Sequence, residues 1–324
     1  MNRHHNYLLI FCLLISIITF LSLPVHAKNN PVVRPKIGIA LGGGGARGAA
    51  HIGVLKVFER ENIPVDYLVG TSAGALIASL YAGGVGLDEL EYQVLSGAIE
   101  KVYKIDFSLF RAAFVYMNRT CRTILRRPFY AGLYNDRRLQ HFVDNLISKD
   151  DGKIKIFIPL HIIALDLISG LPVVIKSGDV GLAVQASAAI PSLHQPIPIN
   201  DQLLIDGGVV QNIPVEEARK MGADIVIAID VDAKPEEAKS ENFRSFEGVI
   251  TRVINLGLLA QSELVLEKAD IVISPDLNGV GILDLDTQSL IKAIKAGEDE
   301  AIKMIPKIKK KIEQKTSTLN IAEY

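Results

Sequence analysis

The feature that most constrains the fold of this chain is a serine set between a strand pattern and a helix pattern. Gly70-Thr-Ser72-Ala-Gly74 follows the apolar run Tyr67-Leu-Val-Gly and precedes an apolar helical stretch that starts at Ala73. A serine on such a sharp turn is held above the sheet, and small neighbours leave room for the tight corner. The following helix also offers free N–H groups and a positive dipole end where an oxyanion forms. The segment is therefore typical of a nucleophile elbow.

The residues on either side of the elbow predict the sheet that carries it. Small and apolar residues alternate from Lys36 to Leu41 and run into Gly42-Gly-Gly-Gly45, which predicts a buried strand ending in a glycine turn. Arg47 to Asn62 has helical spacing, Val65 to Val69 predicts a second strand, and Ala73 to Gly83 predicts a second helix. Strand, helix, strand and helix in this order predict parallel strands with right-handed crossovers. We therefore expect an α/β fold, a three-layer sandwich with a mostly parallel central sheet.

The rest of the chain continues this alternation. Strands are expected at 154–163, 172–176, 202–205, 225–231 and 271–274, and helices at 87–99, 136–147, 180–187, 215–221, 247–267 and 287–315. The helical insertion at about 85–150 contains a basic, aromatic stretch from Arg111 to Tyr134, which is either a lid over the site or a solvated surface. We place a catalytic domain at 36–232 and a helical and strand extension, packed on the same domain, at 233–324.

The first 27 residues differ in kind from the rest. Arg3 is followed by the apolar run Tyr7 to Leu23 and by Val25-His-Ala27, the pattern of a cleaved secretory signal peptide. An uncleaved membrane anchor at residues 7–23 is the alternative, because the run approaches spanning length. In either case we expect the remaining chain to be secreted or to lie in the periplasm or envelope.

Composition excludes some classes of function. The chain has 49% hydrophobic and 22% charged residues and a net charge of −1, with no basic stripe of the kind that binds DNA or RNA. Its 324 residues can bury a large core. Cys121 is the one thiol that remains after the N-terminal apolar run, so no intramolecular disulfide is expected and stability must come from the core.

Ser72 needs a base within hydrogen-bond reach, because a free hydroxyl is a poor nucleophile. Four histidines, 51, 141, 161 and 194, follow the N-terminal segment, and core or surface packing is the default role of each. His194 alone lies on a loop, Pro191 to Pro198, and has the position of a triad base. The second candidate is Asp206, which ends a short apolar strand and precedes two glycines. Asp166 also follows an apolar strand and ranks behind Asp206. A carboxylate acts as a base toward a hydroxyl only where burial raises its pKa.

The glycine loop Gly43-Gly-Gly-Ala-Arg-Gly48 has two interpretations. It is either a dinucleotide-binding loop or an oxyanion hole, in which glycine N–H groups face a tetrahedral oxygen. The first interpretation requires an acid at the end of the second strand, about 20 residues on. That strand ends instead at Gly70-Thr71-Ser72, and no Lys-Ser or Lys-Thr follows Gly48 to make a P-loop. The sequence favours the oxyanion hole.

Three segments in this order resemble the motifs of the patatin-like phospholipases: Gly43 to Gly48, Gly70 to Gly74, and Asp206-Gly-Gly208. The strand before the first segment and Ala186-Ser-Ala-Ala-Ile-Pro191 also look like that family. The resemblance covers residues 36–232 and is closest to bacterial members related to the neuropathy target esterase domain. It implies a patatin-like sandwich.

The resemblance also implies a Ser–Asp dyad without histidine, in which Ser72 is the nucleophile and Asp206 its general base. The residues implied for the oxyanion hole are Gly43, Gly44, Gly45, Arg47 and Gly48. The glycines implied to support the two turns are Gly70, Gly74, Gly207 and Gly208. No metal and no cofactor are implied. His194 departs from the apolar residue expected at that position.

The expected function is a serine lipid acyl hydrolase of the phospholipase A or lysophospholipase type that works through an acyl-enzyme. Its partners would be phospholipid or another lipid ester and, transiently, a membrane surface, with no nucleic acid. The alternatives are a soluble carboxylesterase or thioesterase with the same dyad, and a non-catalytic nucleotide-binding or scaffold protein. An apolar face with Ile302, Ile305, Ile308 and Ile312 either lies on a membrane or packs on the sheet.

Overall fold

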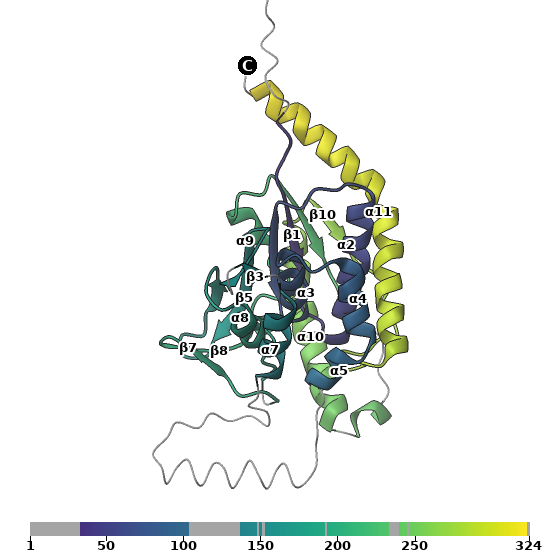
Figure 1. Cartoon of the computed structure of the whole chain (residues 1–324). Helices are drawn as coiled ribbons and strands as arrows, with labels where there is room; N and C mark the ends of the chain where they lie inside the picture. The colour runs from purple at the N-terminus through teal and green to yellow at the C-terminus, as the bar shows by residue number, and fades with distance from the viewer. Residues whose placement is uncertain are drawn as a thin grey trace, which may run out of the picture. The chain divides into compact units, whose positions relative to one another are not determined.

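A computed structural model describes residues 33–103, 137–147, 149–150, 153–191, 193–232, 240–244 and 246–322 (Figure 1). The expected signal peptide or anchor at residues 1–27 and the basic stretch Arg111 to Tyr134 lie outside the described residues. Residues 34–324 form one compact unit. Within the described ranges, no helix is both long enough and apolar enough to cross a bilayer.

The core of the molecule is an eight-stranded sheet. Its strands are β1 (Ile37–Leu41), β2 (Tyr67–Thr71), β5 (Leu160–Asp166), β6 (Pro172–Ile175), β7 (Ile197–Ile199), β8 (Gln202–Asp206), β9 (Ile225–Ile229) and β10 (Ile271–Ile273). The α-helices are α2 (Ala50–Arg60), α3 (Ala73–Ala82), α4 (Leu87–Leu95), α5 (Ala98–Tyr103), α7 (Arg138–Leu146), α8 (Val180–Ser187), α9 (Val215–Lys220), α10 (Phe246–Leu266) and α11 (Thr287–Ala322). The short elements are η1 (Gly45–Ala49), η2 (Gly207–Val209), η3 (Ser240–Phe243), β3 (Lys149–Asp150) and β4 (Lys153–Ile154).

Most expected elements are confirmed, and the departures have local causes. The expected helix 87–99 is two helices, because Gly97 adopts φ +76° between α4 and α5. The expected strand 154–163 is divided between the β3–β4 hairpin and β5. β7 lies in the segment around His194 that is expected to be a loop. It is a three-residue edge strand paired with β8, and its central Pro198 argues against a strand in the sequence.

The strand order is β10-β9-β1-β2-β5-β8-β7, with β6 also paired to β5. β10, β9, β1, β2 and β5 are parallel, which confirms the mostly parallel sheet. β6, β7 and β8 join antiparallel at one end. The carboxyl ends of the parallel strands therefore share one edge, which is where open α/β sheets bind ligands.

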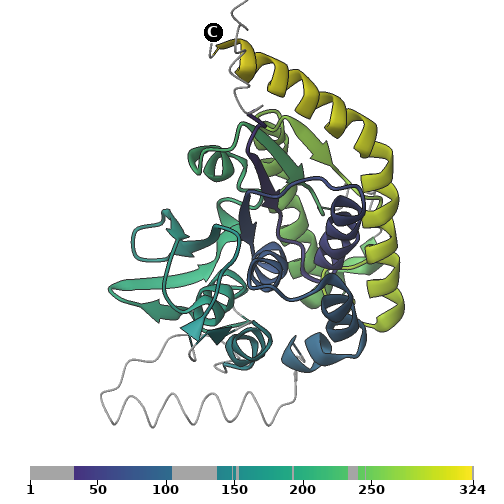
Figure 2. The ribbon, with the colours of Figure 1, turned by 45° about the horizontal axis from the view of Figure 1, so that its top comes forward.

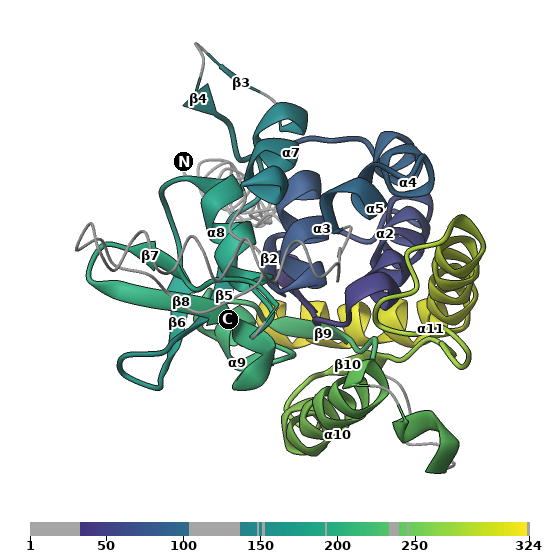
Figure 3. The ribbon, with the colours of Figure 1, turned by 90° about the horizontal axis from the view of Figure 1, so that it is seen from below.

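Helices cover both faces of the sheet, as a three-layer sandwich requires. α2, α3, α7 and α8 lie on one face, and α9 and α10 lie on the other (Figure 3). The alternation of β1 explains the two cores. Ile37, Ile39 and Leu41 point into the larger core under α2 and α3, whereas Ala40 points into the smaller core with Ala218 of α9.

The C-terminal extension is integrated into this body. β10 pairs with β9 at the edge of the sheet, and α11 runs along α2 (Figures 1 and 2). The two helices meet through glycines, since a Cβ on Gly53 or Gly297 would overlap a carbonyl of the other helix. Ile305 and Ile308 are buried and Ile302 is exposed. The apolar face of α11 thus packs on the protein, and the interpretation of this face as a membrane surface is wrong for its buried residues.

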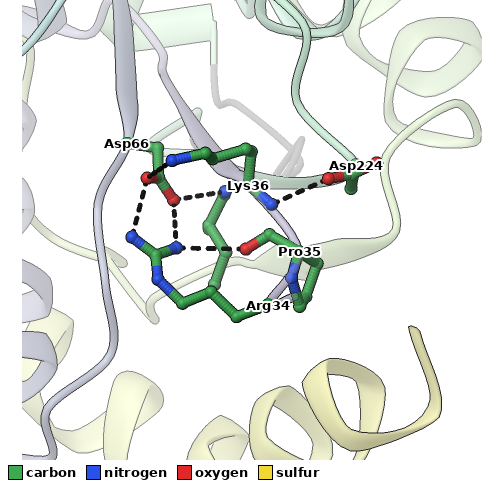
Figure 4. A network of polar contacts seen from close by, with 6 residues as sticks. Arg34, Pro35, Lys36, Asp66 and Asp224 are labelled. Atoms are coloured by element: carbon green, nitrogen blue, oxygen red, sulfur yellow. Dashed lines mark hydrogen bonds and ion pairs between the residues drawn. The ribbon is translucent and has the colours of Figure 1, made fainter. Parts of the chain in front are cut away.

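A network of hydrogen bonds and ion pairs connects the segments just before β1, β2 and β9 (Figure 4). The guanidinium of Arg34 donates to both Asp66 oxygens at 2.6 and 2.8 Å, and the Asp66 carboxylate also accepts from the N–H of Ile37 at 2.9 Å. The N–H of Lys36 donates to Asp224 at 2.8 Å. Burial raises the pKa of Asp66, but these hydrogen bonds outweigh it and leave the pKa below its ordinary value. The opposite, carboxyl-end edge of the sheet carries the candidate site.

Candidate active site

Ser72 lies on a strained turn between β2 and α3. Its φ of 52° and ψ of −119° are rare for a residue with a side chain. A Cβ on Gly70 would lie 2.5 Å from the carbonyl oxygen of Gly74, and one on Gly74 would overlap the end of β1, so the turn requires both glycines. The N–H of Ser72 donates to Oγ of Ser187 at 2.8 Å, and that hydroxyl donates to the carbonyl of Ile163 at 2.5 Å. The elbow predicted from the sequence is therefore present.

The register of β5 brings Asp206 to Ser72. Thr71, the last residue of β2, pairs with Ile163, and Asp206, the last residue of β8, pairs with Ala164. Since β6 occupies the opposite edge of β5 at both positions, β2 and β8 share one edge and meet there end to end. The residue after β2 and the last residue of β8 are thus neighbours, although 134 positions separate them in the chain.

The two side chains are hydrogen-bonded. Oγ of Ser72 donates to Oδ2 of Asp206 at 2.7 Å, and the N–H of Gly208 donates to Oδ1 at 2.8 Å. Asp206 is 7% exposed, and burial raises its pKa to about 6 against the lowering effect of both hydrogen bonds. A Cβ on Gly207 would lie 2.5 Å from the carbonyl oxygen of Ile163, so this glycine lets β8 end against β5. The raised pKa makes this carboxylate a stronger base than an exposed aspartate.

Asp166 has a different environment. Its carboxylate accepts hydrogen bonds from the N–H groups of Leu203, Ile168 and Ser169 and from the Ser169 hydroxyl. The hydrogen bond from Leu203, followed by that of the Ser169 side chain, lowers the pKa of Asp166 to about 2. Asp166 therefore caps the turn that follows it, which explains its place at the end of β5 without a role in proton transfer.

The four histidines that follow the N-terminal segment have separate environments. Nε2 of His51 is 2.8 Å from the carbonyl oxygen of Gly42, and burial lowers the pKa of this histidine to about 4. His161 contacts Glu217 at 2.9 Å on the other side of the sheet, and His141 is exposed. His194 lines the same cavity as Ser72. The packing role expected of His51 is confirmed.

The glycine loop is fixed next to Ser72 by Asn212. The N–H of Gly43 donates to Oδ1 of Asn212 at 3.1 Å, and Nδ2 of Asn212 donates to Asp232 at 3.0 Å. Ser262 of α10 donates to the same Asp232 carboxylate at 2.6 Å. A Cβ on Gly43 would lie 3.0 Å from Cβ of Ser72, so the loop passes Ser72 at van der Waals distance.

The residues implied for the oxyanion hole separate into two groups. Gly44 and Gly45 line the cavity together with Gly43, and their N–H groups have no acceptor among the described residues. Arg47 and Gly48 do not line it. Nε of Arg47 donates to the carbonyl of Val280 at 2.7 Å, and Gly48 allows close packing on the first residue of α3. Arg47 and Gly48 thus hold the loop in place from behind.

A cavity of about 740 Å³ opens beside Ser72 and Asp206. Its wall is largely apolar and comes from α3, the segment before His194, the Asp206 turn, α10 and the loop before α11. The apolar lining residues include Leu76, Ile99, Ile190, Pro191, Val209, Val253, Leu258, Ile282, Leu283 and Leu285. Its size is that of a pocket for an organic ligand, roughly 300–1,000 Å³. In the part of the chain that the structure describes, no three His, Cys, Asp or Glu side chains are grouped so that they could hold a metal ion.

Sequence reasoning missed three residues of the site. Ser187 positions the N–H of Ser72, and Asn212 and Asp232 hold the glycine loop. Asp232 follows the carboxyl end of β9, next to β1 in the sheet, so its place could have been inferred from the strand order. Burial raises the pKa of Asp232 to about 6. Neither Ser187 nor Asn212 had a spacing that pointed to its contact.

The fold and the site define an α/β protein with a serine on a strained strand-to-helix turn and a buried carboxylate at the carboxyl edge of its sheet. Residues 39–219 match the family model described as patatin-like phospholipase. The chain belongs to the patatin-like phospholipase family, which confirms the resemblance drawn from its motifs and places it among the lipid ester hydrolases.

Known relatives are much longer than this chain. It is 30% identical over 197 residues to lysophospholipase NTE1 of Yarrowia lipolytica, a match that covers 60% of this chain and 12% of that protein. It is 30% identical over 224 residues to patatin-like phospholipase domain-containing protein 6 of Homo sapiens, covering 65% of this chain and 14% of that protein. The crystal structure of VipD from Legionella pneumophila has 13% identity and a TM-score of 0.46, over 85% of this chain and 67% of that one.

Proposed function

We propose that this chain is a serine lipid acyl hydrolase of the phospholipase A or lysophospholipase type. The observation that carries the proposal is the 2.7 Å hydrogen bond from Oγ of Ser72 to a buried Asp206 carboxylate at the wall of an apolar cavity. The names of the relatives from Yarrowia and human agree with it. The apolar part of the wall suits an acyl chain, and the polar groups of Ser72, Asp206 and the glycine loop suit its ester.

In the first half of the reaction, Oγ of Ser72 attacks the acyl carbonyl carbon while Oδ2 of Asp206 takes the hydroxyl proton. The tetrahedral oxygen accepts hydrogen bonds from the N–H groups of Gly44 and Gly45, which are fixed before substrate binds. The ester C–O bond then breaks, and the leaving alcohol takes the proton from Asp206. The acyl group remains as an ester on Ser72.

In the second half, water attacks the acyl-enzyme and Asp206 takes one of its protons. The second tetrahedral intermediate collapses, the fatty acid leaves, and Ser72 regains its proton from Asp206. A single carboxyl group thus serves as base and acid in both halves. Its pKa of about 6 suits this, because a group with a pKa near the working pH both takes and returns a proton.

A fluorophosphonate probe tests the nucleophile. The wild-type chain should be labelled, and Ser72→Ala should abolish labelling and the release of fatty acid from mixed phospholipids and lysophospholipids. Asp206→Ala should also abolish turnover. Normal turnover in Asp206→Ala together with its loss in His194→Ala would assign the base to His194 instead. Hydrolysis of soluble esters or thioesters without any release from lipids would favour the soluble esterase alternative.

We also propose that residues 1–27 direct the chain out of the cytoplasm, on the pattern of Arg3, the apolar run and Val25-His-Ala27. N-terminal sequencing of the protein recovered from cell fractions tests this. A mature N-terminus at residue 28 in the periplasmic or culture fraction is expected. An intact N-terminus in the membrane fraction would support the anchor, and an intact N-terminus in the cytoplasm would contradict both.

A further inference from the structure

The outer face of α10 carries exposed apolar side chains in a row. Val249, Val253, Leu256 and Leu264 are 43%, 64%, 45% and 72% exposed, at the spacing of one helical face. Ala260 is exposed on the same face. The helix carries three charged residues, Glu247, Arg252 and Glu263, so its net charge is −1. A run of this kind on a soluble protein marks an interaction site.

This face is continuous with the wall of the catalytic cavity. Val253 belongs to both the exposed face and the cavity lining. Gly257, which is exposed, and Leu258 also line the cavity. Val209, which follows the Asp206 turn, also lines the cavity and is 46% exposed. The apolar surface outside the protein therefore leads into the apolar space beside Ser72.

The inner face of α10 is fixed to the catalytic machinery. The Ser262 hydroxyl donates to Asp232 at 2.6 Å, and Nε2 of Gln261 donates to the carbonyl of Val209 at 2.7 Å. Figure 3 shows α10 as an outer element on the face of the sheet that it shares with α9. A partner that covers the exposed face would thus lie over the cavity, at a fixed position relative to Ser72.

We propose that the α10 face, Val249, Val253, Leu256, Ala260 and Leu264, inserts into a lipid surface and delivers lipid directly into the cavity. The proposal rests on the proposed function, because a lipid ester is the ligand that must pass from an apolar layer to Ser72. Because the helix has no net positive charge, its attraction to lipid must come from apolar burial, so binding should persist on zwitterionic lipid and in high salt.

Flotation of the full chain with phosphatidylcholine vesicles in high salt measures this binding without catalysis. The variant carries Leu256→Asp and Leu264→Asp, neither of which lines the cavity. The matched control is Ile302→Asp on α11, because Ile302 and Leu256 are both 45% exposed. Vesicle binding should fall at least about tenfold in the double variant and stay at the wild-type level in the control.

A soluble short-chain ester distinguishes failure of this proposal from failure of the proposed function. The double variant should cleave the soluble ester at the wild-type rate and show an unchanged melting temperature, while its rate on vesicles falls with binding. Wild-type vesicle binding by the double variant, or a loss in the Ile302→Asp control, would overturn the proposal. A wild-type dimer that the double variant dissociates, with no vesicle binding by either, would assign the face to a second copy. Absence of esterase activity with vesicle binding intact would instead count against the proposed function.

Discussion

Asp206→Asn should raise the stability of the protein while removing its activity. Burial moves the pKa of this carboxyl from 3.8 to about 6, a change of about 2 units, and each unit corresponds to about 1.4 kcal/mol. The ionised form therefore costs the folded state about 3 kcal/mol at pH 8. Asparagine has the same shape and keeps an oxygen for the N–H of Gly208. It has no charge to bury.

Because the pKa of Asp206 is raised in the folded state, its contribution to stability depends on pH in a definite direction. Between pH 3.8 and about 6 the folded protein binds a proton that the unfolded chain has lost. The contribution of Asp206 to stability is thus complete below pH 3.8 and is lost as pH rises through about 6. The gain in Asp206→Asn should be about 3 kcal/mol at pH 8, reduced by an unmade hydrogen bond of Ser72, and should vanish near pH 4.

Thermal unfolding followed by circular dichroism at pH 4 and pH 8 measures this difference. A gain of about 2–3 kcal/mol corresponds to a melting temperature about 5 °C higher at pH 8. Asp66→Asn is the control of opposite sign, because hydrogen bonds to Arg34 and its neighbours hold the pKa of Asp66 below its ordinary value. It should lower stability at pH 8. An equal gain for Asp206→Asn at both pH values, or a loss at pH 8, would refute the reasoning.

Three further predictions concern the surroundings of the candidate dyad. Asn212→Ala frees the glycine loop and should lower kcat about tenfold or more with little change in KM, measured on a soluble ester. Gly74→Ala should prevent folding or lower the melting temperature steeply, because its Cβ would overlap backbone, whereas Gly86→Ala, with nothing within 4 Å of its Cβ, should have little effect. Because burial lowers the pKa of His51 to about 4, stability should fall by about 3 kcal/mol between pH 6.5 and pH 4, and His51→Gln should not show this loss.

The sequence was sufficient to predict the elbow, the glycine loop and the strands that precede them. Each of these depends on local geometry, since Gly70 and Gly74 are needed by a turn that closes within a few residues. The two faces of β1 can also be predicted locally, because the alternation of side chains along the strand places Ile39 in one core and Ala40 in the other. Such features can be predicted from sequence because they depend on steric contacts within one short segment.

The contacts between segments could not be predicted in the same way. Asn212 and Gly43 are 169 positions apart, and the Asn212 side chain makes two hydrogen bonds with the Gly43 backbone. No local pattern around either residue predicts this contact. The part of the cavity wall that α10 forms also depends on how the C-terminal extension packs on the catalytic domain. A periodic helix pattern gives the length and the apolar side of a helix, but not which strand it covers. Contacts between segments that are far apart in the chain therefore cannot be predicted from local sequence patterns.

One peptide unit of β5 positions both members of the candidate dyad. The carbonyl of Ile163 accepts the Ser187 hydroxyl, which in turn accepts the N–H of Ser72. The same carbonyl lies against Gly207, directly after Asp206. Since a shift of one residue in a strand turns every side chain to the other face, the pairing of Asp206 with Ala164 is what aims the carboxylate at the serine. The geometry of the site thus follows from the place where two strands of opposite direction meet along a third.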